Sequence, residues 1–271
     1  MRFLGVDLAW KPDNPSGAVA LDGAKFPLRL VEPPLTLPTH DAVQEWIDRR
    51  VEGARATVGI DAPLLGLERP GRRPCDDAVS AAFGRFHAST HTPTQVPALA
   101  RLTARLVERH GLHAFDPAAC VVPGRPTIRE VYPNALHVRL FGLARPGGVI
   151  LKYKRRRFPA KADWVRAGLA PFVTRCARDL GGAYVRATDP EWRGLVAARP
   201  RAAMSGRRLK DIEDRWDALL CALAVALAEL RPGSVRAYTG GPGPRAWRRG
   251  YILAPALAAG RDARASANRV R

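Results

Sequence analysis

The chain has 271 residues, with 44 lysine and arginine residues against 25 aspartate and glutamate residues, which gives a formal net charge of +19. The length suits one large α/β domain, and the basic balance suits a polyanionic partner such as nucleic acid. The longest late apolar stretch, 218–228, is too short to span a bilayer. Most basic residues are arginines, a bias that a GC-rich genome would also produce, so charge alone leaves both explanations open.

The cysteines, at positions 75, 120, 176 and 221, have neither metal-ligand nor redox spacing, so we expect reduced thiols. The N-terminal apolar run is broken at Asp7 and lacks the features of a cleavable signal. These observations predict a soluble, cytoplasmic protein with no membrane partner.

The first ten residues, MRFLGVDLAW, form an apolar run with a single carboxylate, Asp7, near its end. The run predicts a buried strand, and Gly5 would let that strand pass close to a neighbour. Short strands are expected at 18–21 and 28–32, so the chain opens with a three-stranded meander. A buried carboxylate is costly without a partner, and we expect a partner for Asp7 elsewhere in the chain.

A helix is expected from about residue 39, with four apolar residues on one face: Val43, Trp46, Ile47 and Val51. The next strand, 57–61, ends at Asp61 and repeats the pattern of an apolar run followed by a carboxylate. The order strand, helix, strand indicates a parallel crossover. Asp61 is therefore the candidate partner of Asp7.

The loop 66–77 is basic and leads into a helix at about 76–87, and another helix is expected at 98–110. Three arginines of this loop could contact phosphates, although a solvated loop is the alternative: Arg69, Arg72 and Arg73. The histidine pairs 87/91 and 110/113 have no acidic or thiol ligands at a recognisable spacing, so we do not expect a zinc site.

The alternating segment TIREVY, 127–132, predicts a fifth strand that Pro133 closes and that carries Glu130. Residues 152–157, KYKRRR, are the densest basic run and precede a helix expected at 160–180. Four of these residues could bind a nucleic-acid backbone, with an exposed hinge as the alternative: Lys152, Lys154, Arg155 and Arg156. The segment 187–210 is expected to be irregular.

The last predicted helix is 211–230, where Asp214 and Asp217 lie three residues apart and so share one face. Small residues at 218, 222 and 226 would let this helix approach the sheet and bring Asp217 to it. An edge strand is expected within 247–254, followed by a disordered basic tail at 257–271.

Asp7, Asp61 and Asp217 have similar settings, two at strand ends and one on the last helix. In a meander followed by a parallel crossover the first and fourth strands are neighbours, so Asp7 and Asp61 can face each other. Adjacent carboxylates repel and need a cation, and their hard oxygen atoms favour Mg²⁺ or Mn²⁺. Two such ions about 4 Å apart can promote phosphodiester cleavage. The alternative for each aspartate is a helix cap or a pairing with arginine.

The chain resembles the domain-of-unknown-function 429 family, predicted nucleases of the ribonuclease H-like fold, in six motifs that occur in this order: GVDLAW, VGIDAPL, RPCDDA, REVYPNAL, LKYKRRR and RWDALLCALAVAL. The resemblance runs from residue 3 to about 254. It implies an α/β fold with a five-stranded mixed sheet, order 3-2-1-4-5, and helices on both faces. Residues 1–256 would form a single domain with insertions at about 66–126 and 140–210.

The resemblance also implies a set of catalytic residues. Asp7, Asp61 and Asp217 match the acidic positions on the first strand, fourth strand and last helix of ribonuclease H-like nucleases and Holliday-junction resolvases, where they would hold the metal ions. Asp214 resembles the additional acidic position that the resolvases carry one turn earlier. Glu130 belongs to the family's own REVYP motif.

One departure concerns the helix before the fourth strand, where ribonucleases H place a catalytic glutamate and this chain offers only Glu45 and Glu52 in an ordinary amphipathic pattern. The leading hypothesis is a Mg²⁺- or Mn²⁺-dependent nuclease that binds DNA or RNA. A second is a non-catalytic nucleic-acid-binding protein with the same basic surface. A third, an ATP-dependent phosphotransferase of the actin and sugar-kinase type, is weakened because the chain is too short for the two copies of the core that those proteins contain.

Overall fold

The computed structural model describes residues 1–68, 71–94 and 96–257. Its main sheet has six strands: β1 (Arg2–Asp7), β2 (Ser16–Asp22), β3 (Arg29–Leu30), β4 (Leu35–Leu37), β5 (Ala56–Ile60) and β6 (Thr127–Glu130). The strand order is β3-β2-β1-β5-β6, and β4 pairs with β2 at the end away from β3. Strand β1 is antiparallel to β2 and parallel to β5, and β5 is parallel to β6, so the sheet is mixed.

The predicted mixed α/β sheet is therefore present, but its predicted count of five strands is wrong. The additional strand β4 has three residues, too few to show the alternation of buried and exposed positions that marks a strand in a sequence. It follows that the meander at the start of the chain is more elaborate than the sequence indicates.

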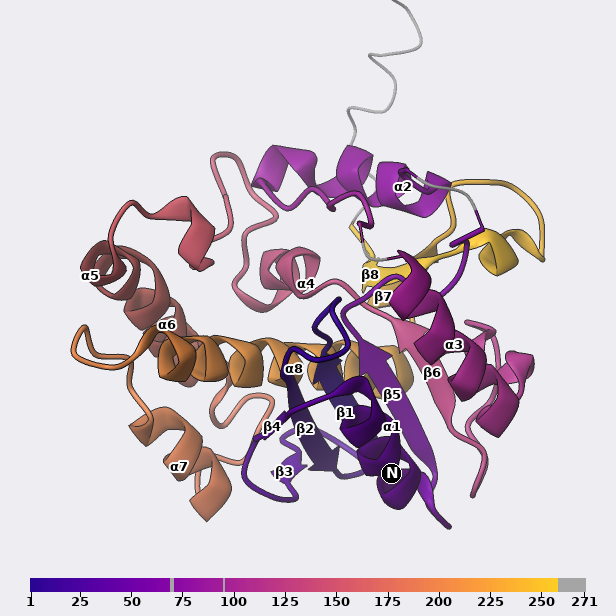
Figure 1. Ribbon diagram of the computed structural model, residues 1–271, viewed down its shortest axis with the longest axis horizontal. Coiled ribbons are helices and arrows are strands. Elements are labelled where there is room, and N and C mark those ends of the chain that lie inside the picture. Colours follow the sequence, from indigo (N-terminus) through magenta and orange to yellow (C-terminus); the bar gives the residue numbers. More distant parts are fainter. Residues whose placement is uncertain (69–70, 95, 258–271) are drawn as a thin grey trace, which may run out of the picture.

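Eight α-helices occur in the described residues: α1 (His40–Val51), α2 (Pro74–Phe83), α3 (Val96–His110), α4 (Pro133–Leu140), α5 (Lys161–Asp163), α6 (Ala170–Leu180), α7 (Pro190–Ala197) and α8 (Gly206–Leu230). Figure 1 shows α8 crossing one face of the sheet and α1 lying on the other. Thr39 caps α1 by accepting a hydrogen bond from the backbone N–H of Ala42 at 3.2 Å. A π-helical segment, Trp164–Leu169, joins α5 to α6.

Helix α8 lies unusually close to the sheet because glycines face it. A Cβ atom at Gly5 would stand 2.0 Å from the carbonyl oxygen of Ala218, and one at Gly17 would stand 2.1 Å from the carbonyl oxygen of Asp214. The sequence predicted that Gly5 would let its strand pass close to a neighbour, and that small residues would let the last helix approach the sheet. Both predictions are confirmed, because Gly5 faces Ala218 and Ala222 of α8. Close packing at Gly17 brings the acidic part of α8 directly onto β1 and β2.

Three other segments differ from the sequence expectation. The region 187–210 is not irregular throughout, because it contains α7 and the start of α8, and Trp192 of α7 packs edge-on against Trp216 at 5.7 Å between ring centroids. Strand β8 (Ile252–Pro255) does not extend the main sheet as a regular edge strand, since it pairs with β7 (Val235–Tyr238) in a separate two-stranded sheet. The predicted tail beyond residue 257 lies outside the described residues.

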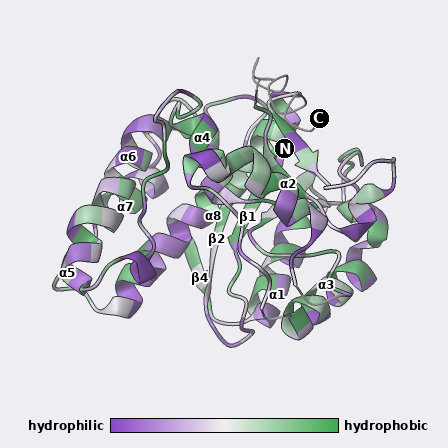
Figure 2. Cartoon of the chain, turned by 90° about the horizontal axis from the view of Figure 1, so that it is seen from above, coloured by the Kyte–Doolittle hydropathy of each residue, from purple (hydrophilic) through white to green (hydrophobic). Residues whose placement is uncertain are grey.

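Figure 2 shows the resulting distribution of hydropathy: the central strands are apolar, whereas α5, α6 and α7 carry hydrophilic residues on their outer surfaces. Helix α8 changes along its length, from hydrophilic near Gly206 to fully buried and apolar from Ala218 to Leu227. None of the helices in the described residues is both long enough and apolar enough to cross a membrane.

Candidate functional site

Two aspartates lie at the carboxyl ends of neighbouring parallel strands. Asp7 is the last residue of β1, and Asp61 directly follows β5. The backbone N–H of Asp61 donates to the carbonyl oxygen of Val6 at 2.9 Å, so the parallel register continues as far as the aspartates. Gly5 and Gly59 both face α8, and side chains two residues apart on a strand share a face. Asp7 and Asp61 are therefore on the side of the sheet that α8 covers.

Helix α8 brings three more carboxylates to the same place: Glu213, Asp214 and Asp217 are all buried, at 1%, 3% and 0% exposure. We call these three residues, together with Asp7 and Asp61, the acidic cluster. Two of its members, Asp7 and Asp214, are in direct side-chain contact. The sequence therefore predicted four of the five members and placed them in the right elements.

Crowding and burial change how the acidic cluster binds protons. Burial raises the pKa of Asp214 to about 9, and the charge of Asp7 is the next largest cause. Burial raises the pKa of Asp217 to about 6. Burial also raises the pKa of Asp61 well above its ordinary value, and the charge of Asp7 is the next largest cause there. Like charges at short range destabilise each other's ionised forms, so the acidic cluster retains protons unless a cation joins it.

Two lysines supply positive charge to the acidic cluster. Lys154 forms ion pairs with Asp217 and with Glu213, the second at 3.4 Å between Nζ and Oε1. Lys210 forms ion pairs with Asp214 and, at 3.0 Å, with Glu213. Burial, the largest single cause, lowers the pKa of Lys154, but the neighbouring negative groups, Asp217 foremost, together outweigh it and raise the pKa well above its ordinary value, so the ammonium group remains charged.

These two lysines leave the acidic cluster incompletely neutralised. Five carboxylates face two ammonium groups, and Oε2 of Glu213 is buried without a hydrogen-bond partner among the described residues. The pKa of Asp61 is set by burial and by neighbouring charges, with no hydrogen bond among its main causes. Because unpaired buried carboxylates are costly, the arrangement favours an additional cation.

The donor atoms suit a hard divalent cation, since carboxylate oxygens are ligands that Mg²⁺ and Mn²⁺ prefer. In the part of the chain that the structure describes, however, no three His, Cys, Asp or Glu side chains are arranged to hold one ion together. Asp217, an expected ligand, is instead bonded by Lys154 and Tyr153. The donor atoms of the acidic cluster thus fit such an ion. Among the described residues, Lys154 and Lys210 pair with the carboxylates of α8, and neither pairs with Asp7 or Asp61.

Part of the basic run 152–157 turns inward to this site. The Tyr153 hydroxyl donates to Oδ1 of Asp217 at 2.6 Å, and its ring stacks on Phe172 at 3.8 Å and 8° between ring planes. Lys154 reaches the acidic cluster and pairs with carboxylates there, whereas the sequence led us to expect a contact with phosphate. Three of the four expected backbone-binding residues of the run are exposed: Lys152, Arg155 and Arg156.

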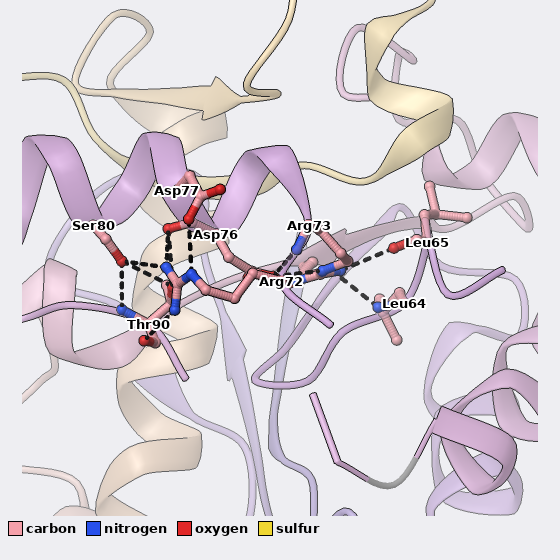
Figure 3. A network of polar contacts seen from close by, with 9 residues as sticks. Leu64, Leu65, Arg72, Arg73, Asp76, Asp77, Ser80 and Thr90 are labelled. Atoms are coloured by element: carbon pink, nitrogen blue, oxygen red, sulfur yellow. Dashed lines mark hydrogen bonds and ion pairs between the residues drawn. The ribbon is translucent and has the colours of Figure 1, made fainter. Parts of the chain in front are cut away.

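Glu130 is held by Arg73 and not by the acidic cluster. Arg73 donates through Nη1 to Oε2 of Glu130 at 2.8 Å and through Nη2 to Oε1, and the backbone N–H of Leu64 donates to Oε2 at 3.0 Å. The same guanidinium bonds both carboxylate oxygens of Asp76, at 2.9 and 3.0 Å, and the carbonyl oxygen of Leu65 at 2.9 Å (Figure 3). We call this set the Arg73 network, and every N–H of its guanidinium has a partner.

The arginines of the loop 66–77 are bonded within the protein in this structure. Arg73 is 3% exposed, and its five guanidinium N–H groups all have partners, which stabilises the fold and leaves no N–H free for a phosphate. Arg72 is likewise engaged, by Asp77 at 2.7 Å and Ser80 at 2.8 Å (Figure 3). Arg69 lies outside the described residues. Glu130 pairs with Ile60 in the sheet register, which directs its side chain to the face opposite Asp61.

A cavity of about 720 Å³ opens beside the acidic cluster, between it and the Arg73 network. Its lining includes the half-buried Asp7 and Asp61 and the buried Glu213, whereas Arg155 and Arg156 of the same lining are exposed. A second cavity of about 470 Å³ is also lined by Asp7, together with Asp214. The site therefore combines a negatively charged interior with a positively charged entrance.

The fold and the cavity define an α/β protein with a carboxylate-rich pocket at the carboxyl ends of central strands, which is where open α/β sheets bind ligands. The family model described as "Protein of unknown function (DUF429)" matches residues 5–242 of the chain. The chain belongs to this family. No curated protein and no solved structure matches the chain.

Sequence reasoning missed three residues of the site: Tyr153, Lys210 and Glu213. A signal for two of them exists, because Lys210, Glu213, Asp214 and Asp217 follow the spacing of a single helix face. Tyr153 had no such signal, because an aromatic residue inside a basic run is equally typical of an exposed segment.

Proposed function

We propose that this protein is a divalent-metal-dependent nuclease with a ribonuclease H-like fold, which hydrolyses phosphodiester bonds of DNA or RNA in the 720 Å³ cavity. The observation that carries the proposal is the charge of the acidic cluster: three buried carboxylates of α8 and two half-buried ones at the ends of β1 and β5 meet two lysines. Such an excess is costly unless cations bind to it, and a net charge of +19 suits a polyanionic substrate.

The strand order and the positions of the aspartates support the fold assignment. Acidic residues lie at the end of β1, after β5 and on the last long helix, as the family resemblance implies. Glu130 has a structural role in this proposal, since Arg73 saturates its carboxylate. The catalytic set is thereby reduced to the acidic cluster.

Each part of the site has a role in this proposal. Asp7 and Asp61 hold the cation, with Asp214 and Asp217 as further ligands once Lys210 and Lys154 turn toward the substrate's phosphates. Bound Mg²⁺ or Mn²⁺ supplies an activated water and stabilises negative charge on the leaving oxygen. Arg155 and Arg156 bind phosphates at the cavity entrance.

The test is cleavage of labelled single- and double-stranded DNA and RNA in Mg²⁺, in Mn²⁺ and in EDTA. We expect metal-dependent cleavage that falls more than about 100-fold in Asp61→Asn, because a ligand matters more than the surrounding residues, whose loss costs 10- to 100-fold. Asp41→Asn is the matched control, since the Asp41 side chain is 73% exposed and lies on α1. Absence of cleavage with every substrate and metal would refute the proposal.

One observation favours a second candidate, a nucleic-acid-binding protein without catalysis. Lys154 and Lys210 already pair with carboxylates, so the acidic cluster is partly compensated without metal. In that case Asp7→Asn would leave nucleic-acid binding unchanged or tighten it, because a negative charge near the phosphates is removed. Gel-shift affinity measured beside cleavage separates the two candidates.

A further inference from the structure

The two cavities beside the acidic cluster are joined by a shared wall. Five residues line both the 720 Å³ and the 470 Å³ cavity: Asp7, Leu8, Trp10, Thr94 and Lys210. Asp7 therefore borders two open spaces and not one. A ligand long enough to fill both cavities would pass over the acidic cluster.

The outer parts of the two cavities are basic. Arg155 and Arg156 line the first cavity, and Lys11 and Arg207 line the second, and all four are exposed. Positive charge on both sides of an acidic centre matches a polymer that carries phosphates on each side of the reacting bond. A mononucleotide would use one side only.

Trp10 supplies an aromatic surface at the junction. It packs partly against the core and is partly exposed, and it lines both cavities. The residue before it is fixed on both sides, because Ser16 accepts a hydrogen bond from the N–H of Ala9 at 3.0 Å and His40 bonds its carbonyl oxygen at 2.6 Å. The backbone that leads into Trp10 is thus held in place before any ligand arrives, which lowers the cost of binding.

We infer that the substrate is an unpaired stretch of polynucleotide that runs across both cavities with one base stacked on Trp10. The inference rests on the proposed function, which it narrows to single-stranded DNA or RNA. A base offers its flat face to an indole only when it has left its duplex stack, and such stacking is independent of sequence. Three of the five carboxylates are buried and the other two are half-buried, a setting that suits a single strand better than a rigid duplex.

The test measures binding in EDTA, so that it does not depend on cleavage. Fluorescein-labelled oligothymidine and oligouridine of roughly 12 nucleotides are compared with a duplex of equal length by fluorescence anisotropy. We expect the single strands to bind more tightly than the duplex. We expect Trp10→Ala to weaken single-strand binding about tenfold, which corresponds to 1.4 kcal/mol and lies within the range for loss of one stacked base.

Tryptophan fluorescence gives a second measurement on the same samples. The other five tryptophans are at most 7% exposed, so quenching by an oligonucleotide should arise at Trp10 and disappear in Trp10→Ala. Trp10→Leu keeps apolar packing but has no aromatic face, and it should bind as weakly as Trp10→Ala, whereas Trp10→Phe should retain most of the affinity. Val149→Ala, at a side chain that is 42% exposed, is the control.

The outcomes separate this inference from the proposed function. Duplex binding as tight as single-strand binding, or native affinity in Trp10→Leu and Trp10→Ala, would overturn the inference even if the protein is a nuclease. Trp10-dependent single-strand binding without cleavage in any metal would refute the nuclease and leave the binding mode standing.

Discussion

The acidic cluster and the Arg73 network are both rich in carboxylates and largely buried, yet they balance charge in different ways. In the Arg73 network one guanidinium meets two carboxylates, and each of its N–H groups has an acceptor. In the acidic cluster five carboxylates share two ammonium groups, and one oxygen of Glu213 has no partner among the described residues. Members of both groups line the 720 Å³ cavity.

This difference in charge balance separates a group that stabilises the fold from a group that is a candidate for binding a ligand. A buried polar network in which each hydrogen-bonding group has a partner fixes one conformation and leaves little for a ligand to add. A buried cluster with excess charge of one sign has an unmet requirement that a cation can satisfy. In the sequence, the motifs REVYP and GVDLAW are equally good candidates for a functional site. In the structure, GVDLAW contributes Asp7 to the acidic cluster, whereas REVYP contributes Glu130 to the Arg73 network.

Removal of the central cation from the Arg73 network should have the largest effect on stability. We expect Arg73→Met to lower the free energy of unfolding by about 3–5 kcal/mol, because Glu130 and Asp76 would be left as buried carboxylates without their cation. Urea denaturation measures this loss.

A surface pair provides the control for this change. Arg49→Met removes an ion pair whose side chains are 66% and 70% exposed, and it should cost less than about 1 kcal/mol. Adding Glu130→Gln to Arg73→Met should restore part of the stability, because the orphaned carboxylate becomes neutral. Native stability in Arg73→Met would show that the saturated network is dispensable.

The acidic cluster should respond most strongly to pH. Asp214 has a pKa of about 9 in the folded chain against 3.8 ordinarily, so the folded state binds its proton more tightly than the unfolded state does. This contribution to stability is complete below pH 3.8 and is lost as the pH rises to about 9. Each such carboxyl lowers the free energy of unfolding by up to about 1.4 kcal/mol per pH unit, or roughly 3 kcal/mol between pH 6 and 8.

Metal-free protein should therefore become easier to denature with urea as the pH rises through this range. Asp214→Asn should flatten the dependence, whereas Asp41→Asn, at an exposed side chain, should leave it unchanged. Added Mg²⁺ should also flatten it, since a bound cation favours the ionised carboxylates. A rise in stability between about pH 6 and 8 would contradict the assigned balance of charge in the acidic cluster.

Much of the fold could be predicted because its central elements have strong patterns. Strands β1 and β5 are apolar runs ended by an aspartate, and α8 has a long apolar face. The missed helices α4 and α7 both begin with a proline in the first turn, at Pro133 and Pro190. Proline ends a strand and also opens a helix, so local sequence does not decide between these two structures.

The site was less predictable because its counter-charges are remote in sequence. Lys154 is 63 residues from Asp217, and no local pattern joins the two. Arg73 and Glu130 are 57 residues apart, so the loop arginine was assigned to a ligand when its partner lies inside the protein. A sequence shows which residues carry charge, but the pairing of those charges is decided by tertiary contacts.

The smallest predicted effect concerns the Tyr153 hydroxyl, which contacts the acidic cluster. Tyr153→Phe removes the hydrogen bond to Asp217 and keeps the stacking on Phe172, so we expect a loss of about 1.5 kcal/mol in urea denaturation. Tyr132→Phe is the matched control, because its hydroxyl bonds the backbone carbonyl of Ser89 at a partly exposed position, and it should cost about 0.5 kcal/mol. Equal losses in both variants would mean that Asp217 gains nothing from the hydroxyl, and that Lys154 alone satisfies this carboxylate.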